Sequence, residues 1–267
     1  MRENAIKVAI GLFIAGILLF SACGIKTEDA SISKIPETPV PATPTPEPTA
    51  APTPQIPDLQ KELLDERDKT TVSVIGKFDF RNYTYPLPRG WEDPDGDEVQ
   101  LDNGVRKMTE DKIGLSYVTT KYLDVTGDGH DDAVVILKIV TAGSAIPQLV
   151  YIFSWKEEKP ELIWYFRTGD RADGGLKDMR LENGLLLIEL YGQDRFILGE
   201  LETSKITGDE EQLCCPTFFS RTYYKWNGKN FLMQGKRLTF SVSDPDATPQ
   251  QNLGEIVNDP KTPAKKK

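Results

Sequence analysis

Short runs of alternating apolar and polar residues, separated by tight-turn sequences, constrain the fold of this chain most strongly. The turns are Asp102-Asn103-Gly104, Glu182-Asn183-Gly184 and Trp226-Asn227-Gly228-Lys229. Asn-Gly between apolar runs is a strong hairpin signal, because both residues accept the positive φ of a two-residue turn. The pattern therefore predicts antiparallel strands joined by short turns.

The expected strands extend through most of the region from residue 71 to 240. They are Thr71–Phe80, Val99–Asp102, Ile113–Leu123, Ala133–Val140, Gln148–Trp155, Leu162–Arg167, Gly175–Arg180, Leu185–Tyr191, Thr217–Trp226 and Phe231–Phe240. No fixed-period repeat is present, which argues against a propeller of identical blades. We predict an all-β fold, mainly an antiparallel meander that closes into a sandwich or a partial barrel, and both closures remain open.

One short helix is expected before the strands. The residues from Asp58 to Arg67 place Leu59, Leu63 and Leu64 on one side of a helix, and Asp58 is suited to cap its first turn.

The N-terminus carries the features of a secretion signal. Arg2 and Lys7 precede an apolar run, Val8–Phe20, that is too short to span a bilayer. The following stretch, Leu19–Gly24, resembles a bacterial lipobox, although Phe20 replaces the usual leucine. This resemblance implies cleavage after residue 22 and a palmitate-type acyl anchor on Cys23. Gly24 is not followed by Asp, which implies sorting to the outer membrane if the host has one; an uncleaved anchor or an ordinary signal peptide is the alternative.

The remaining domain boundaries follow from composition. Residues 23–57 form an acylated, proline-rich linker, with nine of the chain's 19 prolines between Pro36 and Pro57. Such a segment favours an extended polyproline conformation, with a reach on the order of 70 Å at about 3.1 Å per residue. Residues 58–240 form the β-rich domain. Residues 241–267 are rich in Ser, Asp, Pro and Gln and are expected to be disordered.

Charge and rare residues exclude several classes of function. The formal net charge of −9 argues against binding nucleic acid. One histidine and three cysteines, with Cys23 assigned to the lipid, leave too few ligands for a Cys/His zinc site. A Ser-His-Asp triad would need the single histidine, His130.

An acidic loop, residues 124–132, carries the clearest chemistry. It reads Asp-Val-Thr-Gly-Asp-Gly-His-Asp-Asp. Calcium takes six to eight oxygen ligands, and a loop with a glycine at the turn can aim alternate residues at one point. The expected ligands are the side chains of Asp124, Thr126, Asp128 and Asp132, with the backbone carbonyl of His130.

The segment after the loop decides which calcium motif this is. An EF-hand needs Glu at position 12 and a helix, whereas the chain has Val135 within an apolar strand. The loop resembles instead the calcium loops between strands of FG-GAP and VCBS-type repeats, with Thr126 where these usually carry Asp or Asn and with one copy. The resemblance implies a structural Ca²⁺. The alternative is a metal-free Asp/Gly hairpin.

Two further features are candidate sites. Cys214 and Cys215 are adjacent, and a bond between them would be strained because their Cα atoms are only about 3.8 Å apart. It would form a stiff turn or, alternatively, a redox-labile switch. In Gly169–Gly175, Asp170, Arg171 and Asp173 either face a ligand or pair with each other in a solvated turn.

The sequence is compatible with three classes of function. Phe78–Pro86, the acidic loop, the Gly169–Gly175 loop and Cys214-Cys215-Pro216 together resemble a group of bacterial lipoproteins and secreted proteins, which implies no activity. The first expectation is a binding module of the cell envelope for a protein or glycan. The contact candidates are those of the aromatic residues Tyr83, Tyr85 and Trp91 that are exposed. The alternatives are a carboxylate-dependent hydrolase acting on glycans and an envelope scaffold.

Overall fold

The structure, a computed structural model, describes residues 60–89, 91–92, 94, 96–143, 147–171, 173–204 and 215–251. The expected fold class is confirmed, because the described residues form fourteen strands and two short 3₁₀ turns. All of them belong to one compact unit, Thr53–Lys267. The predicted signal peptide, Cys23, the proline-rich segment and Cys214 lie outside the described residues.

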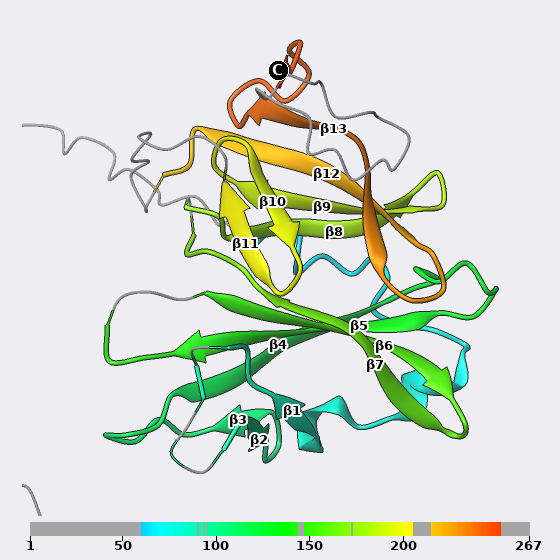
Figure 1. Cartoon of the computed structure of the whole chain (residues 1–267), viewed down its shortest axis with the longest axis vertical. Helices are drawn as coiled ribbons and strands as arrows, with labels where there is room; N and C mark the ends of the chain where they lie inside the picture. The colour runs from blue at the N-terminus through cyan, green and yellow to red at the C-terminus, as the bar shows by residue number, and fades with distance from the viewer. Residues whose placement is uncertain are drawn as a thin grey trace, which may run out of the picture. The chain divides into compact units, whose positions relative to one another are not determined.

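The elements follow one another in the order of Figure 1. The two 3₁₀ turns are η1 (Val74–Lys77) and η2 (Phe80–Asn82). The strands are β1 (Thr84–Pro86), β2 (Glu98–Gln100), β3 (Val105–Arg106), β4 (Gly114–Leu123), β5 (Asp132–Val140), β6 (Gln148–Lys156), β7 (Lys159–Arg167), β8 (Leu176–Glu182), β9 (Leu185–Tyr191), β10 (Arg195–Leu198), β11 (Leu201–Ser204), β12 (Phe218–Trp226), β13 (Phe231–Ser241) and β14 (Gln250–Gln251).

A seven-stranded sheet forms the centre of the fold, in the order β10-β11-β7-β6-β5-β4-β3. Its strand β5 contains the run Ala133–Leu137, in which every residue is buried. A continuous apolar run, rather than an alternating one, is typical of a strand covered on both faces. Ala133, Val135 and Leu137 belong to one core cluster, and Val134 and Ile136 belong to another.

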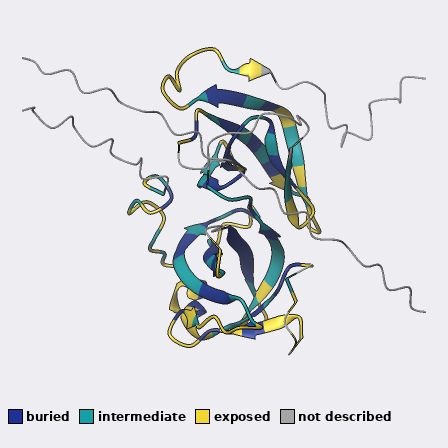
Figure 2. Cartoon of the chain, turned by 90° about the vertical axis from the view of Figure 1, so that its left-hand side faces the viewer, coloured by how far each residue is buried: buried dark blue, intermediate teal, exposed yellow. Residues whose placement is uncertain are grey.

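The N-terminal segment covers one face of this central sheet. Ile75, Phe80, Tyr85 and Val99 pack with the β5 and β6 side chains of that face. The small sheet of β1 and β2, antiparallel with Tyr85 opposite Val99, supplies part of this cover. The layer lies beside the central sheet in Figure 1. Figure 2 shows buried stretches in dark blue along the strands of the domain.

A five-stranded sheet, in the order β14-β13-β12-β9-β8, covers the other face. Residues from both sheets form one core cluster, which includes Val134 and Ile152 of the central sheet and Leu186 and Ile188 of the second. Of the two predicted closures, the structure therefore has the sandwich, with an additional N-terminal layer.

A hairpin of β10 and β11 joins the two sheets along one side. Leu201 of β11 pairs in parallel with Arg167 of β7, the single parallel strand contact in the described part of the chain. On the other side, the Tyr224 hydroxyl of β12 donates to the Ile197 carbonyl (3.0 Å) and accepts from its N–H (2.8 Å). The hairpin is thus attached to both layers.

A buried ion pair also joins the sheets. Lys121 of β4 and Asp178 of β8 are almost completely inaccessible, and the Lys121 Nζ to Asp178 Oδ1 distance is 2.9 Å. Lys121 also donates to the Met179 carbonyl at 2.8 Å, and Asp178 accepts from Arg180 at 2.8 Å. Charges removed from water at this depth are tolerated only when they are paired and hydrogen-bonded.

The predictions of two elements near the start of the domain, one helix and one strand, were wrong. The predicted helix ending at Arg67 is a single turn, in which Leu64 N–H donates to the Gln60 carbonyl at 2.9 Å. The predicted strand Thr71–Phe80 contains η1 and is not a strand. Leu63 and Ile75 nevertheless lie in the core. The conformation of this segment is therefore determined by burial of these side chains in the core and not by the local periodicity of its apolar residues.

At the C-terminal end, ordered pairing continues past the predicted domain boundary at residue 240. Gln250 and Gln251 of β14 pair antiparallel with Thr239 and Leu238 of β13. Among the described residues, no helix is both long and apolar enough to cross a membrane.

Candidate functional site

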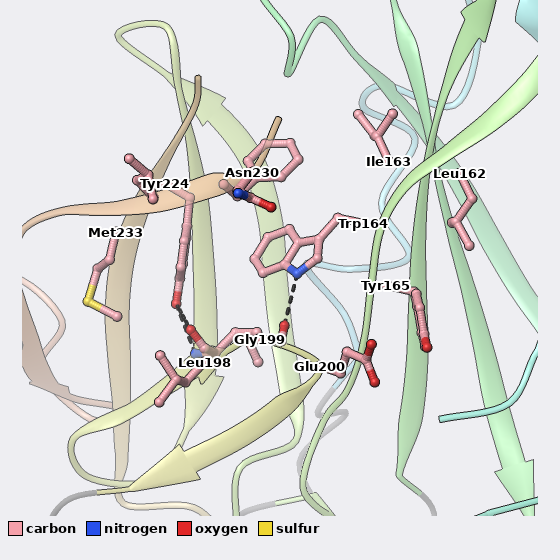
Figure 3. Close-up of a pocket in the computed structure, with 13 residues that line it drawn as sticks. Leu162, Ile163, Trp164, Tyr165, Leu198, Gly199, Glu200, Tyr224, Asn230 and Met233 are labelled. Atoms are coloured by element: carbon pink, nitrogen blue, oxygen red, sulfur yellow. Dashed lines mark hydrogen bonds between the residues drawn. The ribbon is translucent and has the colours of Figure 1, made fainter. Parts of the chain in front are cut away.

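A groove of about 560 Å³ lies where β7, the β10–β11 turn and the β12–β13 hairpin meet. Figure 3 shows its lining residues converging from these three elements. The volume falls within the range of about 300–1,000 Å³ that is usual for ligand sites. Its lining is mostly apolar, with Asn230 and Glu200 as polar side chains near its ends.

Trp164 organises the groove. Its indole N–H donates to the Gly199 carbonyl at 2.9 Å, which ties β7 to the β10–β11 turn (Figure 3). Its ring stacks on Phe231 with centroids 4.8 Å apart and lies 5.3 Å from Tyr224. Phe231 stacks on the indole and Tyr224 packs against it at a tilted angle, so Trp164 holds the walls together.

Exposed aliphatic side chains rim the groove. Leu198 is 54% exposed and Leu232 is 38% exposed, and both line it. Leu201, at the start of β11, is 42% exposed. Clustered exposed leucines beside a cavity are typical of an interaction surface, whereas single ones are ordinary.

Strand edges border the groove on both sides. Pairing between β7 and β11 is confined to Arg167 and Leu201, and pairing between β13 and β14 to Leu238 and Thr239. Arg167 N–H donates outward to the Glu200 carbonyl at 2.9 Å. Since outward-facing backbone groups alternate along a strand, Tyr165 presents its N–H and C=O to the same side. The groove thus combines apolar walls with backbone donors and acceptors.

The predicted calcium loop forms a tight turn between β4 and β5. The Asp124 carboxylate accepts the backbone N–H groups of Gly127 (2.7 Å), Asp128 (3.0 Å) and Gly129 (2.9 Å). Gly127 and Gly129 have φ of +75° and +87°, a region that glycine adopts without strain. Asp128 accepts from the exposed His130 N–H at 2.9 Å. Backbone capping is the geometry expected of the hairpin alternative.

Asp132 lies at the buried end of this loop. It accepts the Thr126 N–H at 2.9 Å and is 1% exposed. Burial raises the pKa of Asp132 to about 6, against the opposing effect of hydrogen bonds from the Ser154 hydroxyl and the Thr126 amide. A cavity of about 220 Å³ borders Asp132, His130 and Ser154.

The Asp132 pKa predicts an unusual dependence of stability on pH. Its value rises from 3.8 to about 6, so the folded state binds this proton more tightly than the unfolded state does. The contribution of the protonated Asp132 to the free energy of unfolding is therefore complete below pH 4. It is lost as the pH rises to about 6, and the loss is up to about 3 kcal/mol. Urea unfolding between pH 4 and 7 in EDTA should show this loss in the wild type and not in Asp132→Asn. Parallel profiles would contradict the prediction.

The donor set of the loop suits a hard cation in type. Thr126 Oγ1 is buried and makes no hydrogen bond, and the carboxylates of Asp124, Asp128 and Asp132 keep further lone pairs. Within the described residues, no group of three His, Cys, Asp or Glu side chains is placed to hold a metal ion. Calcium binding by this loop stays a prediction.

The Gly169–Gly175 loop is held by pairing within the chain. Asp170 and Asp173 form an isolated antiparallel bridge, and Arg171 Nη2 lies 3.3 Å from Asp170 Oδ2. Asp173 forms an ion pair with Arg195 of β10, which also binds Glu202 at 3.2 Å. Of the two alternatives for this loop, internal pairing is the one that the geometry displays.

The aromatic contact candidates and the cysteines occupy different environments. Tyr85 is fully buried and its hydroxyl donates to the Phe80 carbonyl, so it is not one of the exposed aromatic residues that could contact a ligand. Tyr83 packs against the same core, and Trp91 lies 5.6 Å from the Arg167 guanidinium. Cys215 is exposed, while its neighbour Cys214 lies outside the described residues.

The groove residues were missed by the sequence argument. Trp164, Phe231 and Leu232 lie in strands that were predicted, but β10 and β11 were not. A sequence signal for the β10–β11 hairpin was the glycine at position 199. It lies at the turn between the two strands, where its φ is +64°. Nothing local indicates that the ends of β7, β10 and β13 meet, because that depends on how the sheets pack.

No protein-family model, no curated protein and no solved structure matches the chain.

Proposed function

We propose that the chain is a lipid-anchored binding module of the bacterial cell envelope, and that it binds a protein ligand in the groove at Trp164. Cys23 carries the acyl anchor in this proposal, and residues 24–57 space the β domain from the bilayer. Several acyl chains hold a protein firmly, since each buried CH₂ contributes about 0.8 kcal/mol.

The observation that carries the binding proposal is the combination, around one groove, of exposed leucines and strand edges that have no partner strand among the described residues. Leu198 and Leu232 offer apolar contact, and the Tyr165 backbone offers a donor and an acceptor. An extended polypeptide can use both, because added strands gain main-chain hydrogen bonds and alternate side-chain pockets. A glycan would have less of the Trp164 indole to stack on, since Phe231 already stacks on this ring.

The hydrolase alternative gains no support at this groove. Glu200 is the single carboxylate among the residues that line it, and glycosidases of the common type use two. Asp132, the carboxyl with the raised pKa, is too buried to meet a substrate in the present conformation.

Site-specific photocrosslinking in living cells tests the binding proposal. A photoreactive amino acid at Leu232 should give discrete protein adducts, and the same group at Val74, exposed on η1 away from the groove, should not. Leu198→Asp should reduce the Leu232 adducts several-fold by placing a charge in the rim. Adducts that are absent at Leu232, or equal at Val74, would sink the proposal.

A second part of the proposal is that Ca²⁺ stabilises the loop at residues 124–132. Extracellular calcium modules bind Ca²⁺ with dissociation constants of about 10⁻⁴–10⁻³ M. Adding 10 mM Ca²⁺ is therefore expected to raise the free energy of unfolding by about 1.5–3 kcal/mol and Tm by several degrees. Thermal melting of the chain in EDTA and in Ca²⁺ measures this. Asp128→Ala should abolish the shift, whereas Asp102→Ala in another turn should not. A wild-type Tm that Ca²⁺ leaves unchanged would favour the metal-free hairpin.

A further inference from the structure

Strand β7 borders the groove with its edge rather than with one face. Four consecutive residues of β7, Leu162–Tyr165, line the groove. Leu162 and Tyr165 pack against the core cluster under the N-terminal layer. Ile163 and Trp164 pack against the cluster between the two sheets. Side chains from both faces of β7 thus reach one cavity, and since β6 pairs with the inner edge of β7, the cavity follows the outer edge.

Strand β13 borders the groove in the same way. Asn230–Met233 line it, and β12 pairs with β13 along this stretch. Phe231 and Met233 pack against the core cluster between the sheets, whereas Leu232 lies on the opposite face of the strand and is 38% exposed. Among the described residues, no strand pairs with the outer edge of β7 before its last residue, or with that of β13 ahead of β14. An extended peptide therefore finds main-chain partners at either wall.

One end of the groove is acidic. Glu200, in the β10–β11 turn, is exposed and is the single charged side chain among the residues that line the groove. Its carboxylate is hydrogen-bonded to the Tyr165 hydroxyl of β7. Burial raises the pKa of Tyr165, and so do this hydrogen bond and the negative charges of Glu200 and Asp97. Asp97, exposed in the loop before β2, thus adds a second carboxylate near the same hydroxyl.

In the described part of the chain, neither of these carboxylates has a basic partner. The arginines of this region are engaged elsewhere. Arg167 holds its guanidinium 5.6 Å from the centroid of the Trp91 ring. Arg195 forms ion pairs with Asp173 and Glu202. Negative charge beside apolar walls attracts a cation more strongly than the same charge on an open surface, because the walls exclude water.

We propose that the ligand of the groove is an extended basic peptide, with an apolar side chain that packs beside Leu198 and Leu232 and an Arg or Lys side chain that pairs with Glu200. The inference rests on the proposed function, since it specifies the ligand of the same groove. Apolar contacts and the strand edges provide the affinity, and Glu200 selects the charge. Arginine suits this position best, because its guanidinium binds a carboxylate through two parallel N–H groups.

Selection from a phage-displayed library of random peptides of about ten residues, the length of a long strand, tests the proposal. The bait is the full chain in detergent micelles. The wild type should enrich peptides with Arg or Lys near an apolar residue. Glu200→Lys should lose that preference and enrich Asp or Glu instead, because the charge that meets the ligand is reversed.

A matched variant separates Glu200 from the overall negative charge of the chain. Glu110→Lys changes the net charge by the same amount, at an exposed position in the β3–β4 connection that does not line the groove. It should enrich the same basic peptides as the wild type. Identical peptide pools from Glu200→Lys and Glu110→Lys would overturn the proposal.

A double-mutant cycle on one enriched peptide measures the contact itself. Glu200→Gln, which keeps the shape of the side chain, should weaken binding about tenfold, as expected for a hydrogen bond to a charged group. Replacing the basic residue of the peptide with Gln should cause a similar loss in the wild type and little further loss in Glu200→Gln. Fluorescence anisotropy of the labelled peptide gives the four dissociation constants. Two losses that simply multiply would show that the basic residue contacts another group, contrary to the proposal.

The same selection distinguishes a failure of this inference from a failure of the proposed function. Leu198→Asp/Leu232→Asp, with charges in the apolar rim, is the reference for a blocked groove. Peptides that the wild type enriches above this reference without a preference for Arg or Lys contradict the inference and leave peptide binding standing. A wild type that enriches nothing above the reference contradicts both.

Discussion

Replacing Lys121 with methionine is expected to lower the free energy of unfolding by about 3–5 kcal/mol. The change leaves Asp178 buried between the two sheets with one of its cationic partners removed. For a domain of this size, the loss corresponds to a fall in Tm of roughly 6–20 °C. Chemical unfolding followed by tryptophan fluorescence measures it.

Two controls separate the buried charge from a general effect of losing a lysine. Lys156→Met breaks an exposed pair with Glu161 and is expected to change stability by less than about 1 kcal/mol. Lys121→Met combined with Asp178→Leu removes both buried charges and should recover part of the loss. If Lys121→Met and Lys156→Met have similar effects, the ion pair does not hold the sheets together.

Replacing Phe153 with alanine is the second change expected to have a large effect, a loss of about 3–5 kcal/mol. Phe153 is fully buried in β6, under the N-terminal layer, and its ring centroid lies 5.1 Å from that of Phe80 and 5.3 Å from that of Tyr83. The cavity left by alanine would lie between the central sheet and this layer.

The location of that cavity gives a second readout. Limited proteolysis of Phe153→Ala should cleave first within residues 73–101, because this segment loses its contact with the central sheet before the sheets separate. Phe153→Leu keeps most of the apolar volume and should lose less than half as much stability. Cleavage first within β8 or β9 would show that the layer is not an independently weakened unit.

The sequence determined the strand content because hairpin signals are local. The strand predicted after the turn Glu182-Asn183-Gly184, Leu185–Tyr191, has the same bounds as β9. The predicted bounds of β5, β6 and β12 are each within one residue of those in the structure. Positive φ at Asn183 and Gly184 explains why this turn could be recognised from residue type alone.

Segments fixed by burial rather than by period were predicted poorly. Leu63 and Ile75 are core residues on a turn and a 3₁₀ element, so neither the helical nor the two-residue period describes them. Strands β1, β3, β10, β11 and β14 have two to four residues each, too short for periodicity to register.

The acidic loop was located by sequence, but its chemistry depends on tertiary detail. Residue types placed Asp124 and Asp132 in one turn, and the structure confirms that turn. The burial of Asp132 raises its pKa to about 6, and the hydrogen bond that it accepts from Ser154 on the neighbouring strand β6 acts in the opposite direction. No local pattern contains that information.

By itself the sequence determined an all-β domain, its hairpins and the position of the acidic loop at residues 124–132, because turn chemistry and strand periodicity act between near neighbours. Only the tertiary structure decided the sandwich closure, the Lys121–Asp178 pair and the groove at Trp164. Each of these joins residues more than 30 positions apart, and such contacts arise from the way two sheets bury their facing surfaces.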